Sequence, residues 1–493
     1  MAALDPDGWI PIRWPCGPLE IERGRRREGF SARETETLRR WSEPRALELL
    51  AGTRVNCLVL PWAEGSREDD AHQRALAPLV TAARGRGLSL VGWAGDDADL
   101  GRAASAAHAA GLDALATSST HAAPGVDLLR FRPRGGADRS AAGFFGVADA
   151  VWPGLKATQD TDVDAWSGPT GPPWIDSNAW YVRLAGTLAS ARTVWLSFDP
   201  PEGPRPPTSA SYVQAVADSE IYGGHWLVSL DSHLRSGLAE GQACARETWT
   251  GIARALAFFA EHRAWRDYQP VGSLGVLSDY AGANEFLSFE VLNLLARQSS
   301  PYRVLEKTRA EEEPLDGLSA VLYVDETPPG RSLLRKLYAF AEAGGTLITP
   351  PGWEERGALD ADAWLPRFRV FRYGGGRVAV SGEELADPQR LAEDAQLLTS
   401  HRHDPVRVFN SGTAVSHYAT SGDGATGVLH LLRFGMPYEE MPVTAWFRRR
   451  WSSARAWRVD STAAEPTPRA VVDSGVEFHL PPVPVYCGLE VAA

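Results

Sequence analysis

The sequence predicts an α/β protein in three parts: a (β/α)8 TIM barrel, a flavodoxin-like α/β domain and a C-terminal β-sandwich. Three observations predict this order. Short apolar runs alternate with segments of helical period up to about residue 268, the alternation restarts near Pro270, and helical periodicity disappears from about residue 400. A chain of 493 residues suits about three domains. We therefore expect domains at 1–268, 269–400 and 401–493.

The barrel strands are expected where short runs are rich in Val, Leu, Phe and Trp. These runs cover residues 10–15, 55–62, 88–94, 112–117, 126–131, 144–152, 193–199 and 225–231. Helical segments are expected at 32–50, 68–85, 98–110, 177–191, 209–221 and 241–265. This number of strands in about 260 residues matches the usual size of a (β/α)8 barrel. The fourth and fifth runs lie too close together for a helix between them.

The middle segment repeats the alternation of strands and helices on a smaller scale. Strands are expected at 271–278, 302–305, 318–324 and 345–349, and helices at 283–298 and 331–343, the second ending at Gly344. This pattern is typical of a doubly wound sheet of flavodoxin-like type. Beyond residue 400, alternating runs such as 426–432 and 476–480 are separated by Gly, Pro and Ser, which favours a β-sandwich.

Composition excludes several classes of function. The formal net charge is −12, which disfavours nucleic acid and anionic membranes as partners. No apolar stretch approaches the roughly 20 residues of a membrane span, and the N-terminus lacks the features of a signal peptide. The four cysteines are far apart, which fits a reducing compartment. We expect a cytoplasmic protein with no cofactor and no metal, since no nucleotide-binding loop or convincing ligand cluster occurs.

In domain order the chain resembles bacterial glycoside hydrolases of the multidomain β-galactosidase type. The segments that carry the resemblance are 274–278, 320–325, 340–350 and 480–490. The resemblance implies a carbohydrate substrate and a middle domain, similar to glutamine amidotransferases, that mediates self-association. The middle domain contains no cysteine, so it lacks the nucleophile of an amidotransferase and we expect a structural role and a homo-oligomer.

Sugar hydrolysis needs two carboxyl groups on opposite sides of the scissile bond, and a barrel presents them at the carboxyl ends of its strands. The resembled enzymes usually place one after strand four and one after strand seven. Here strand four ends without a carboxylate, whereas strand seven ends in Asp199. The candidate catalytic residues at strand or loop ends are Asp176, Asp199, Asp231 and Glu64.

Each candidate has a simpler explanation. Asp176 is equally well explained as the N-cap of a helix, and Glu64 is better explained as a solvated loop residue. Asp199 and Asp231 follow apolar strands in matching positions, which favours a site role for both. We expect the segment 174–178, including Trp174 and Asn178, to line the active cleft and to contact ligand, because a stiff, turn-rich loop precedes it.

Tryptophan placement supports a sugar site. Thirteen of the 18 tryptophans occur by position 265. Trp14, Trp62, Trp93 and Trp152 lie at or near the ends of strands, where a ring of indoles would offer apolar platforms to sugar rings. The alternative is that these side chains fill the core. Barrel interiors usually favour Val, Ile and Leu, so we favour a binding rim.

The sequence leaves two functions open. The first is a glycosidase that uses two carboxylates at the carboxyl face of the barrel. The second is a non-catalytic, glycan-binding or scaffold barrel, which the missing carboxylate after strand four motivates. The basic run at 22–28 is expected to be a solvated loop; if it overhangs the barrel, its arginines would suit an anionic sugar.

Overall fold

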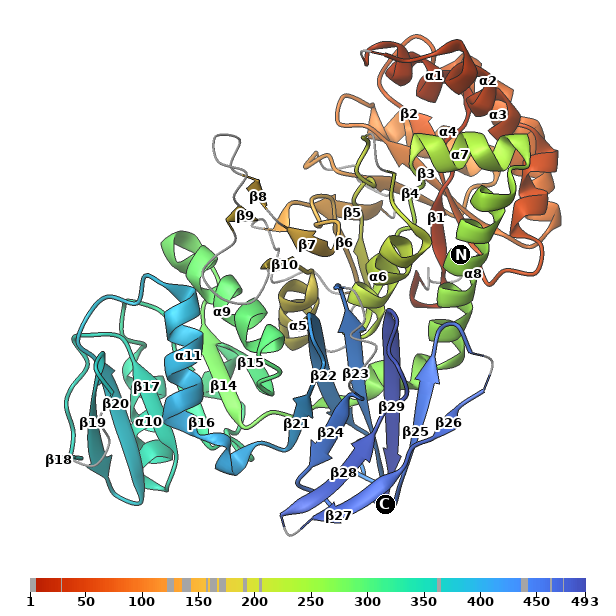
Figure 1. Cartoon of the computed structure of the whole chain (residues 1–493). Coiled ribbons are helices and arrows are strands. Elements are labelled where there is room, and N and C mark those ends of the chain that lie inside the picture. Colours follow the sequence, from red (N-terminus) through yellow and green to blue (C-terminus); the bar gives the residue numbers. More distant parts are fainter. Residues whose placement is uncertain are drawn as a thin grey trace. The chain divides into compact units, whose positions relative to one another are not determined.

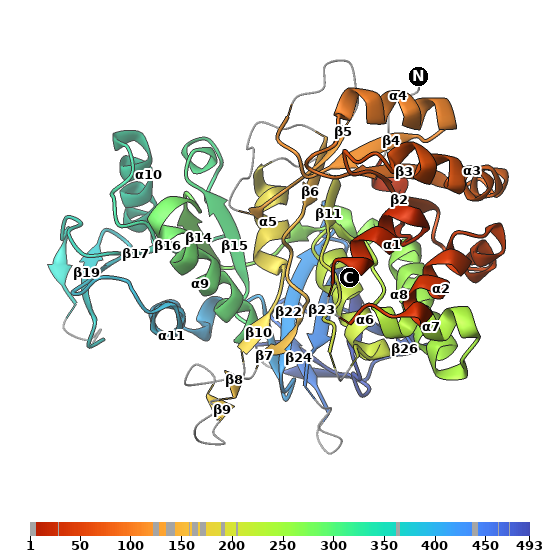
Figure 2. The ribbon, with the colours of Figure 1, turned by 90° about the horizontal axis from the view of Figure 1, so that it is seen from above.

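The protein is seen in Figures 1 and 2 as a computed structural model. It describes residues 6–27, 29–121, 128–134, 143–156, 158–159, 166–167, 174–188, 193–203, 206–360, 365–435, 442–461, 463–472 and 474–493. Contacts divide the chain into two compact units. The first contains Met1–Pro153 and Ala191–Arg263, and the second contains Gly154–Ser190 and Ala264–Ala493.

The first unit is built on a parallel barrel. Its strands, in spatial order, are β1 (Pro11–Arg13), β2 (Cys57–Ala63), β3 (Ser89–Ala94), β4 (Ala114–Thr117), β5 (Leu128–Arg132), β6 (Phe144–Val147), β11 (Thr193–Leu196) and β12 (Gly224–Trp226). A parallel bridge pairs Ile12 with Val228, and the Arg13 amide donates to the Val228 carbonyl over 2.8 Å. The sheet therefore closes between β12 and β1, and the predicted eight-stranded barrel is confirmed.

Most barrel helices lie where the periodicity places them. They are α2 (Ala32–Trp41), α3 (Asp69–Gly85), α4 (Leu100–Ala110), α6 (Ser209–Glu220) and α8 (Ala243–Glu261). The segment expected as one helix over 32–50 is two, because α2 ends before Pro44 and a 3-10 helix (Pro44–Leu50) follows. Pro44 occupies the first turn of that second helix, where its missing N–H costs nothing.

Two helices were not predicted, α1 (Gly17–Arg25) and α7 (Ser232–Glu240). Most of the basic run expected as a solvated loop forms the end of α1. Gly17 takes a positive φ of 81°, and a Cβ there would lie 2.5 Å from the His72 ring, so the helix begins in close contact with α3. This tertiary contact positions a helix in which four of nine residues are charged.

Aromatic side chains fill the barrel interior. Phe131 lies 4.9 Å from Trp93 and 5.7 Å from Phe144 between ring centroids, and Phe144 lies 5.3 Å from Trp195. Trp195 is fully buried with them. Barrel interiors usually favour Val, Ile and Leu, but here large rings join the aliphatic side chains, because small residues on β4, such as Ala116, leave room for them.

The second unit contains a seven-stranded sheet of order β15-β14-β16-β17-β20-β19-β18. Its strands are β14 (Leu274–Ser278), β15 (Tyr302–Glu306), β16 (Ala320–Tyr323), β17 (Thr346–Thr349), β18 (Ala358–Leu359), β19 (Phe368–Tyr373) and β20 (Gly376–Ser381). The first five in this order run parallel, and β19 and β18 extend the edge antiparallel. Its helices are α9 (Glu285–Arg297), α10 (Arg331–Glu342) and α11 (Pro388–Thr399), shown in green to blue in Figure 1.

The C-terminal part of this unit is antiparallel. One sheet contains β13 (Gln269–Pro270), β22 (Ala414–Thr420), β23 (Thr426–Arg433), β29 (Tyr486–Ala492), β25 (Ser453–Arg458) and β26 (Glu465–Pro466). The other contains β21 (Val406–Phe409), β24 (Thr444–Phe447), β28 (Gly475–His479) and β27 (Arg469–Val472). Residues from both sheets, such as Leu429 and Phe478, share one buried apolar cluster.

The stretch between the sixth and seventh barrel strands belongs to the second unit. Its strands β7 (Gly154–Lys156) and β10 (Trp174–Asp176) pair antiparallel, β8 (Thr158–Gln159) pairs with β9 (Trp166–Ser167), and α5 (Ala179–Leu188) follows. Trp180 of α5 stacks on Phe289 of α9 with 3.5 Å between ring centroids. The sequence assigned this helix to the barrel, whereas its apolar side packs on the middle sheet and α9. The boundaries expected at 268 and 400 stay predictions.

Candidate active site

The carboxyl ends of neighbouring barrel strands carry a continuous arc of polar side chains. In spatial order, Asp199 follows β11, Ser229 follows β12, Arg13 ends β1 and Glu64 follows β2. Trp93 on β3 extends the arc by one strand. Function in (β/α)8 barrels is found at this face. The arc is therefore the candidate active site.

Asp199 is held by two neighbours on the arc. Arg13 Nη1 lies 2.9 Å from Asp199 Oδ1, and the Ser229 hydroxyl donates to the same oxygen over 2.9 Å. Desolvation raises the pKa of Asp199, but the positive charge of Arg13 and the hydrogen bond from Ser229 outweigh it and lower the pKa. The Arg13 guanidinium also lies 5.0 Å from the Trp93 ring centroid. Asp199 is thus an ionised, exposed carboxylate in a fixed setting.

Glu64, on the same arc, is bound by Arg23 of α1. The Arg23 guanidinium forms ion pairs with both Glu20 and Glu64. Burial lowers the pKa of Arg23, but the charges of Glu20, Glu64 and Asp199 outweigh it and raise the pKa. Arg23 therefore interacts electrostatically with carboxylates from both ends of the arc. The unpredicted helix α1 is what brings this arginine to the strand ends.

The loop that carries Glu64 is tightly built. The Asp69 carboxylate accepts hydrogen bonds from the Glu64 and Gly65 amides at 3.1 and 3.0 Å. Gly65 has a φ of 74°, and a Cβ there would lie 2.2 Å from the Asp97 carbonyl oxygen. Only glycine fits this position. The backbone at Glu64 is therefore fixed, unlike that of a freely solvated loop.

Asp231 is buried and committed to local structure. It is 2% exposed and caps α7, accepting from the Leu234 amide over 2.9 Å. The Tyr212 hydroxyl donates to its other oxygen over 2.7 Å. Burial, with the charge of Asp231, raises the pKa of Tyr212 far above its ordinary value, so the phenol stays a donor. The contacts of Asp231 are those of a structural cap.

Asp176 lies in the second unit, at the end of β10. Its charge adds to burial in raising the pKa of Glu290 on α9 to about 7. The next residues, Ser177 and Asn178, are buried, and the Ser177 hydroxyl accepts from the Ala179 amide over 3.1 Å. Ser177 therefore caps α5. The side chain of Trp174 and the turn-rich stretch 168–173 lie outside the described residues.

The predicted rim of tryptophans divides into two groups. Trp14 and Trp62 are 0% and 1% exposed, because alternate strand residues point to opposite faces and these two point outward against the helices. Trp14 donates to the Trp41 carbonyl and Trp62 to the Ala103 carbonyl. The prediction that Trp14 and Trp62 face the solvent as sugar platforms is therefore wrong.

Trp93 and Trp152 remain on the rim. Both are partly exposed. Trp152 packs edge-on against Tyr212 and Trp226, with 5.2 and 5.8 Å between ring centroids. Trp93 on β3 pairs with Pro61 of β2, so it points to the opposite face from Trp62, a strand parity that the sequence prediction did not apply. Trp152 lies in the loop beyond β6.

One contact at the fourth strand was missed from sequence. Asp96, just beyond β3, accepts a hydrogen bond from the Ser118 hydroxyl, just beyond β4, over 2.7 Å. Both residues are exposed or partly exposed. A carboxylate from strand three thus reaches the strand end where the sequence has none. The adjacency of β3 and β4 was predicted, so this contact was within reach of sequence reasoning.

Two further properties hold for the described residues. No group of three or more His, Cys, Asp and Glu side chains among them is arranged to hold a metal ion. No helix in the part of the chain that the structure describes is long and apolar enough to cross a membrane.

The fold, an eight-stranded parallel barrel with further sheets, is shared with a solved structure over nearly the whole chain. The chain is similar to the alpha-L-fucosidase isoenzyme 2 from Paenibacillus thiaminolyticus, with a TM-score of 0.57, 10% identity, and coverage of 98% of this chain and 99% of that one. At this identity the likeness establishes a shared fold along nearly the whole length of both chains.

Two β-galactosidases are also similar over most of the chain. The enzyme from Rahnella sp. R3 has a TM-score of 0.41 at 10% identity and covers 86% of this chain and 67% of that one. The enzyme from Bacillus circulans sp. alkalophilus has a TM-score of 0.38 at 11% identity and covers 87% and 68%. No protein-family model and no curated protein matches the sequence.

Proposed function

We propose that this protein is a glycoside hydrolase that acts on an oligosaccharide or glycoside at the carboxyl face of its barrel. The observation that carries the proposal is the setting of Asp199 at the end of the seventh strand, where Arg13 and Ser229 hold the carboxylate ionised. The shared fold with a fucosidase supports the choice of a carbohydrate substrate.

An ionised carboxylate serves as the nucleophile or the base of such a reaction. Asp199 takes this role in our proposal, because Arg13 stabilises its charged form. Glu64 is the second carboxylate that we propose, since Arg23 joins it to the same arc. Asp176 stays a candidate from the second unit, whereas the contacts of Asp231 favour a structural role.

The proposal is tested with a panel of nitrophenyl glycosides and natural oligosaccharides. Asp199→Asn keeps the size and hydrogen-bonding shape of the side chain but removes its charge. We expect activity to fall at least about a thousandfold, in the range of a lost catalytic group, with an unchanged melting temperature. Asp97→Asn, an exposed loop position near the same face, is the matched control and should keep full activity.

The alternative is a non-catalytic barrel that binds glycans. Two observations favour it: β4 ends at Thr117 and is followed by Ser118 in place of a carboxylate, and Trp14 and Trp62 are buried. Binding of a glycan without turnover by the whole panel would support this alternative.

We further propose that the middle domain is flavodoxin-like and mediates self-association, and that the C-terminal sheets form a β-sandwich. The parallel strands of the middle sheet have the spatial order 2-1-3-4-5 of a flavodoxin-like domain. Light scattering should give the mass of an oligomer at micromolar concentration. A monomer mass would contradict the self-association.

A further inference from the structure

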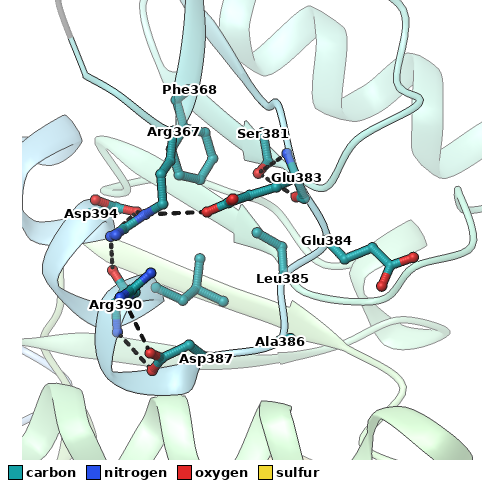
Figure 3. A pocket seen from close by; sticks show the side chains of 11 residues that line it. Arg367, Phe368, Ser381, Glu383, Glu384, Leu385, Ala386, Asp387, Arg390 and Asp394 are labelled. Carbon is teal, nitrogen blue, oxygen red and sulfur yellow. Dashed lines mark hydrogen bonds and ion pairs between the residues drawn. The ribbon is translucent and has the colours of Figure 1, made fainter.

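A cavity of about 230 Å³ lies in the second unit, at the carboxyl end of β20. The loop from β20 into α11 forms one wall, and the start of β19 forms another (Figure 3). The cavity is large enough for a single sugar ring and small for a drug-sized ligand.

At the base of the cavity, the Arg367 guanidinium forms a hydrogen-bonded ion pair with the Asp394 carboxylate. Arg367 Nε and Nη2 lie 2.8 and 2.7 Å from Asp394 Oδ2, and Nη2 also donates to the Arg390 carbonyl. The Asp394 side chain is 9% exposed. Within the described residues, no hydrogen bond reaches Arg367 Nη1 or Asp394 Oδ1. A guanidinium donor and a carboxylate acceptor are thus available side by side.

Apolar side chains complete the base. Phe368 and Leu391 line the cavity and are 4% and 2% exposed, and Leu385 lies beside them. An aromatic and aliphatic floor beside a few convergent polar groups is the lining expected of a small-molecule site. A ligand with one apolar face and several hydroxyl groups suits this lining.

The charged side chains at the rim of the cavity limit the charge that a ligand can carry. Arg390 pairs with Asp387 over 3.3 Å, and Arg367 with Asp394, so the arginines are balanced by carboxylates. Glu383 pairs with Arg367 Nε over 3.9 Å, and Glu384 adds negative charge at the exposed rim. Anionic ligands would be repelled there. Both arginines are already paired with carboxylates, so a charged ligand would lose its hydration without gaining an unpaired counter-charge in the cavity, and a neutral ligand fits best.

We propose that this cavity is a second carbohydrate-binding site, which takes one neutral sugar unit. Each sugar hydroxyl is both donor and acceptor, and vicinal hydroxyls match the adjacent Arg367 and Asp394. The C–H face of the ring lies on the apolar floor. The site does not depend on catalysis in the barrel, so it stands if the proposed hydrolase activity fails.

Photoaffinity labelling of the full chain tests the proposal. The probes are alkyl-diazirine glycosides of glucose, galactose, mannose and fucose, with the free methyl glycosides as competitors and a glucuronide and a glucosamine analogue as charged counterparts. We expect a neutral probe to label residues 367–394 and to be displaced by its methyl glycoside. Labelling should persist in Asp199→Asn, which separates this site from the barrel reaction.

Two variants locate the binding. Replacing both members of the buried pair, Arg367→Met with Asp394→Leu, avoids leaving a single charge buried and should weaken labelling at least about tenfold. Ala386→Trp, which fills the cavity from the loop, should do the same with the ion pair intact. Glu384→Gln is the control, because Figure 3 shows Glu384 turned away from the two arginines.

Several results would overturn the proposal. These are an absence of competed labelling in 367–394, undiminished labelling in both variants when their melting temperatures match the parent chain, or equal labelling by a charged counterpart.

Discussion

Arg13 and Asp199 are 186 positions apart in the sequence, yet Arg13 Nη1 lies 2.9 Å from Asp199 Oδ1. The pair joins the first and seventh strands of the barrel, and closure of the sheet through β12 makes the contact possible. It gives the candidate active site an ionised carboxylate with a fixed orientation.

Removing Arg13 should change the pH dependence of activity. Arg13 lowers the pKa of Asp199, so Arg13→Met should raise it and move the acidic limb of the kcat/KM profile to higher pH. The measurement is kcat/KM against pH on the glycoside found active. Arg25→Met, whose ion pair is with Glu22 on its own helix, is the control and should leave the limb in place.

The two groups of tryptophans should respond differently to truncation. Trp62→Ala removes a fully buried indole and should cost about 3–5 kcal/mol of stability. Trp93→Ala, at the partly exposed strand end, should weaken glycoside binding more than it lowers stability. Thermal unfolding and glycoside titration of both variants check this. Unchanged affinity in Trp93→Ala would remove Trp93 from the site.

Asp231 should behave as a structural residue. Asp231→Ala removes a helix cap, worth about 1–2 kcal/mol, and leaves the Tyr212 hydroxyl without its acceptor, worth about 1–3 kcal/mol. Asp231→Asn keeps the cap and should be milder. Urea unfolding measures both. If Asp231→Asn is as stable as the parent chain but inactive, Asp231 is catalytic and the structural assignment is wrong.

Glu290 should make stability fall as the pH rises from 4.5 through about 7. Its pKa is raised from 4.5 to about 7 by burial and by Asp176, so the folded protein holds a proton that the unfolded chain releases. The stabilisation is full below pH 4.5 and is lost as pH rises through about 7. Glu290→Gln should therefore flatten the melting temperature between mildly acidic and mildly alkaline pH.

The matched control is Glu285→Gln at the start of the same helix, which should follow the parent curve. Parallel curves for Glu290→Gln and the parent chain would contradict the assignment of a proton to Glu290.

The local pattern of apolar residues was sufficient to locate the barrel strands in the sequence. The apolar runs at 55–62 and 88–94 contain β2 and β3 to within a residue or two, because strand and helix periods are properties of short segments. The same reasoning identified Asp199 as the carboxylate at the end of strand seven. Asp96 was noted only as a carboxylate at a strand end, and the roles of Arg23 and Asp96 were not predicted, because Arg23 pairs with Glu64, 41 positions away, and Asp96 with Ser118 beyond a neighbouring strand.

By itself, the sequence determined the order of the barrel strands, the eight-stranded barrel and the position of Asp199. Tertiary structure alone decided how α1 carries Arg23 to Glu64 and that α5 packs on α9 in the second unit. The physical reason is that backbone periodicity depends on neighbouring residues, whereas ion pairs and ring stacking depend on closure and packing across long separations. No short segment contains that information.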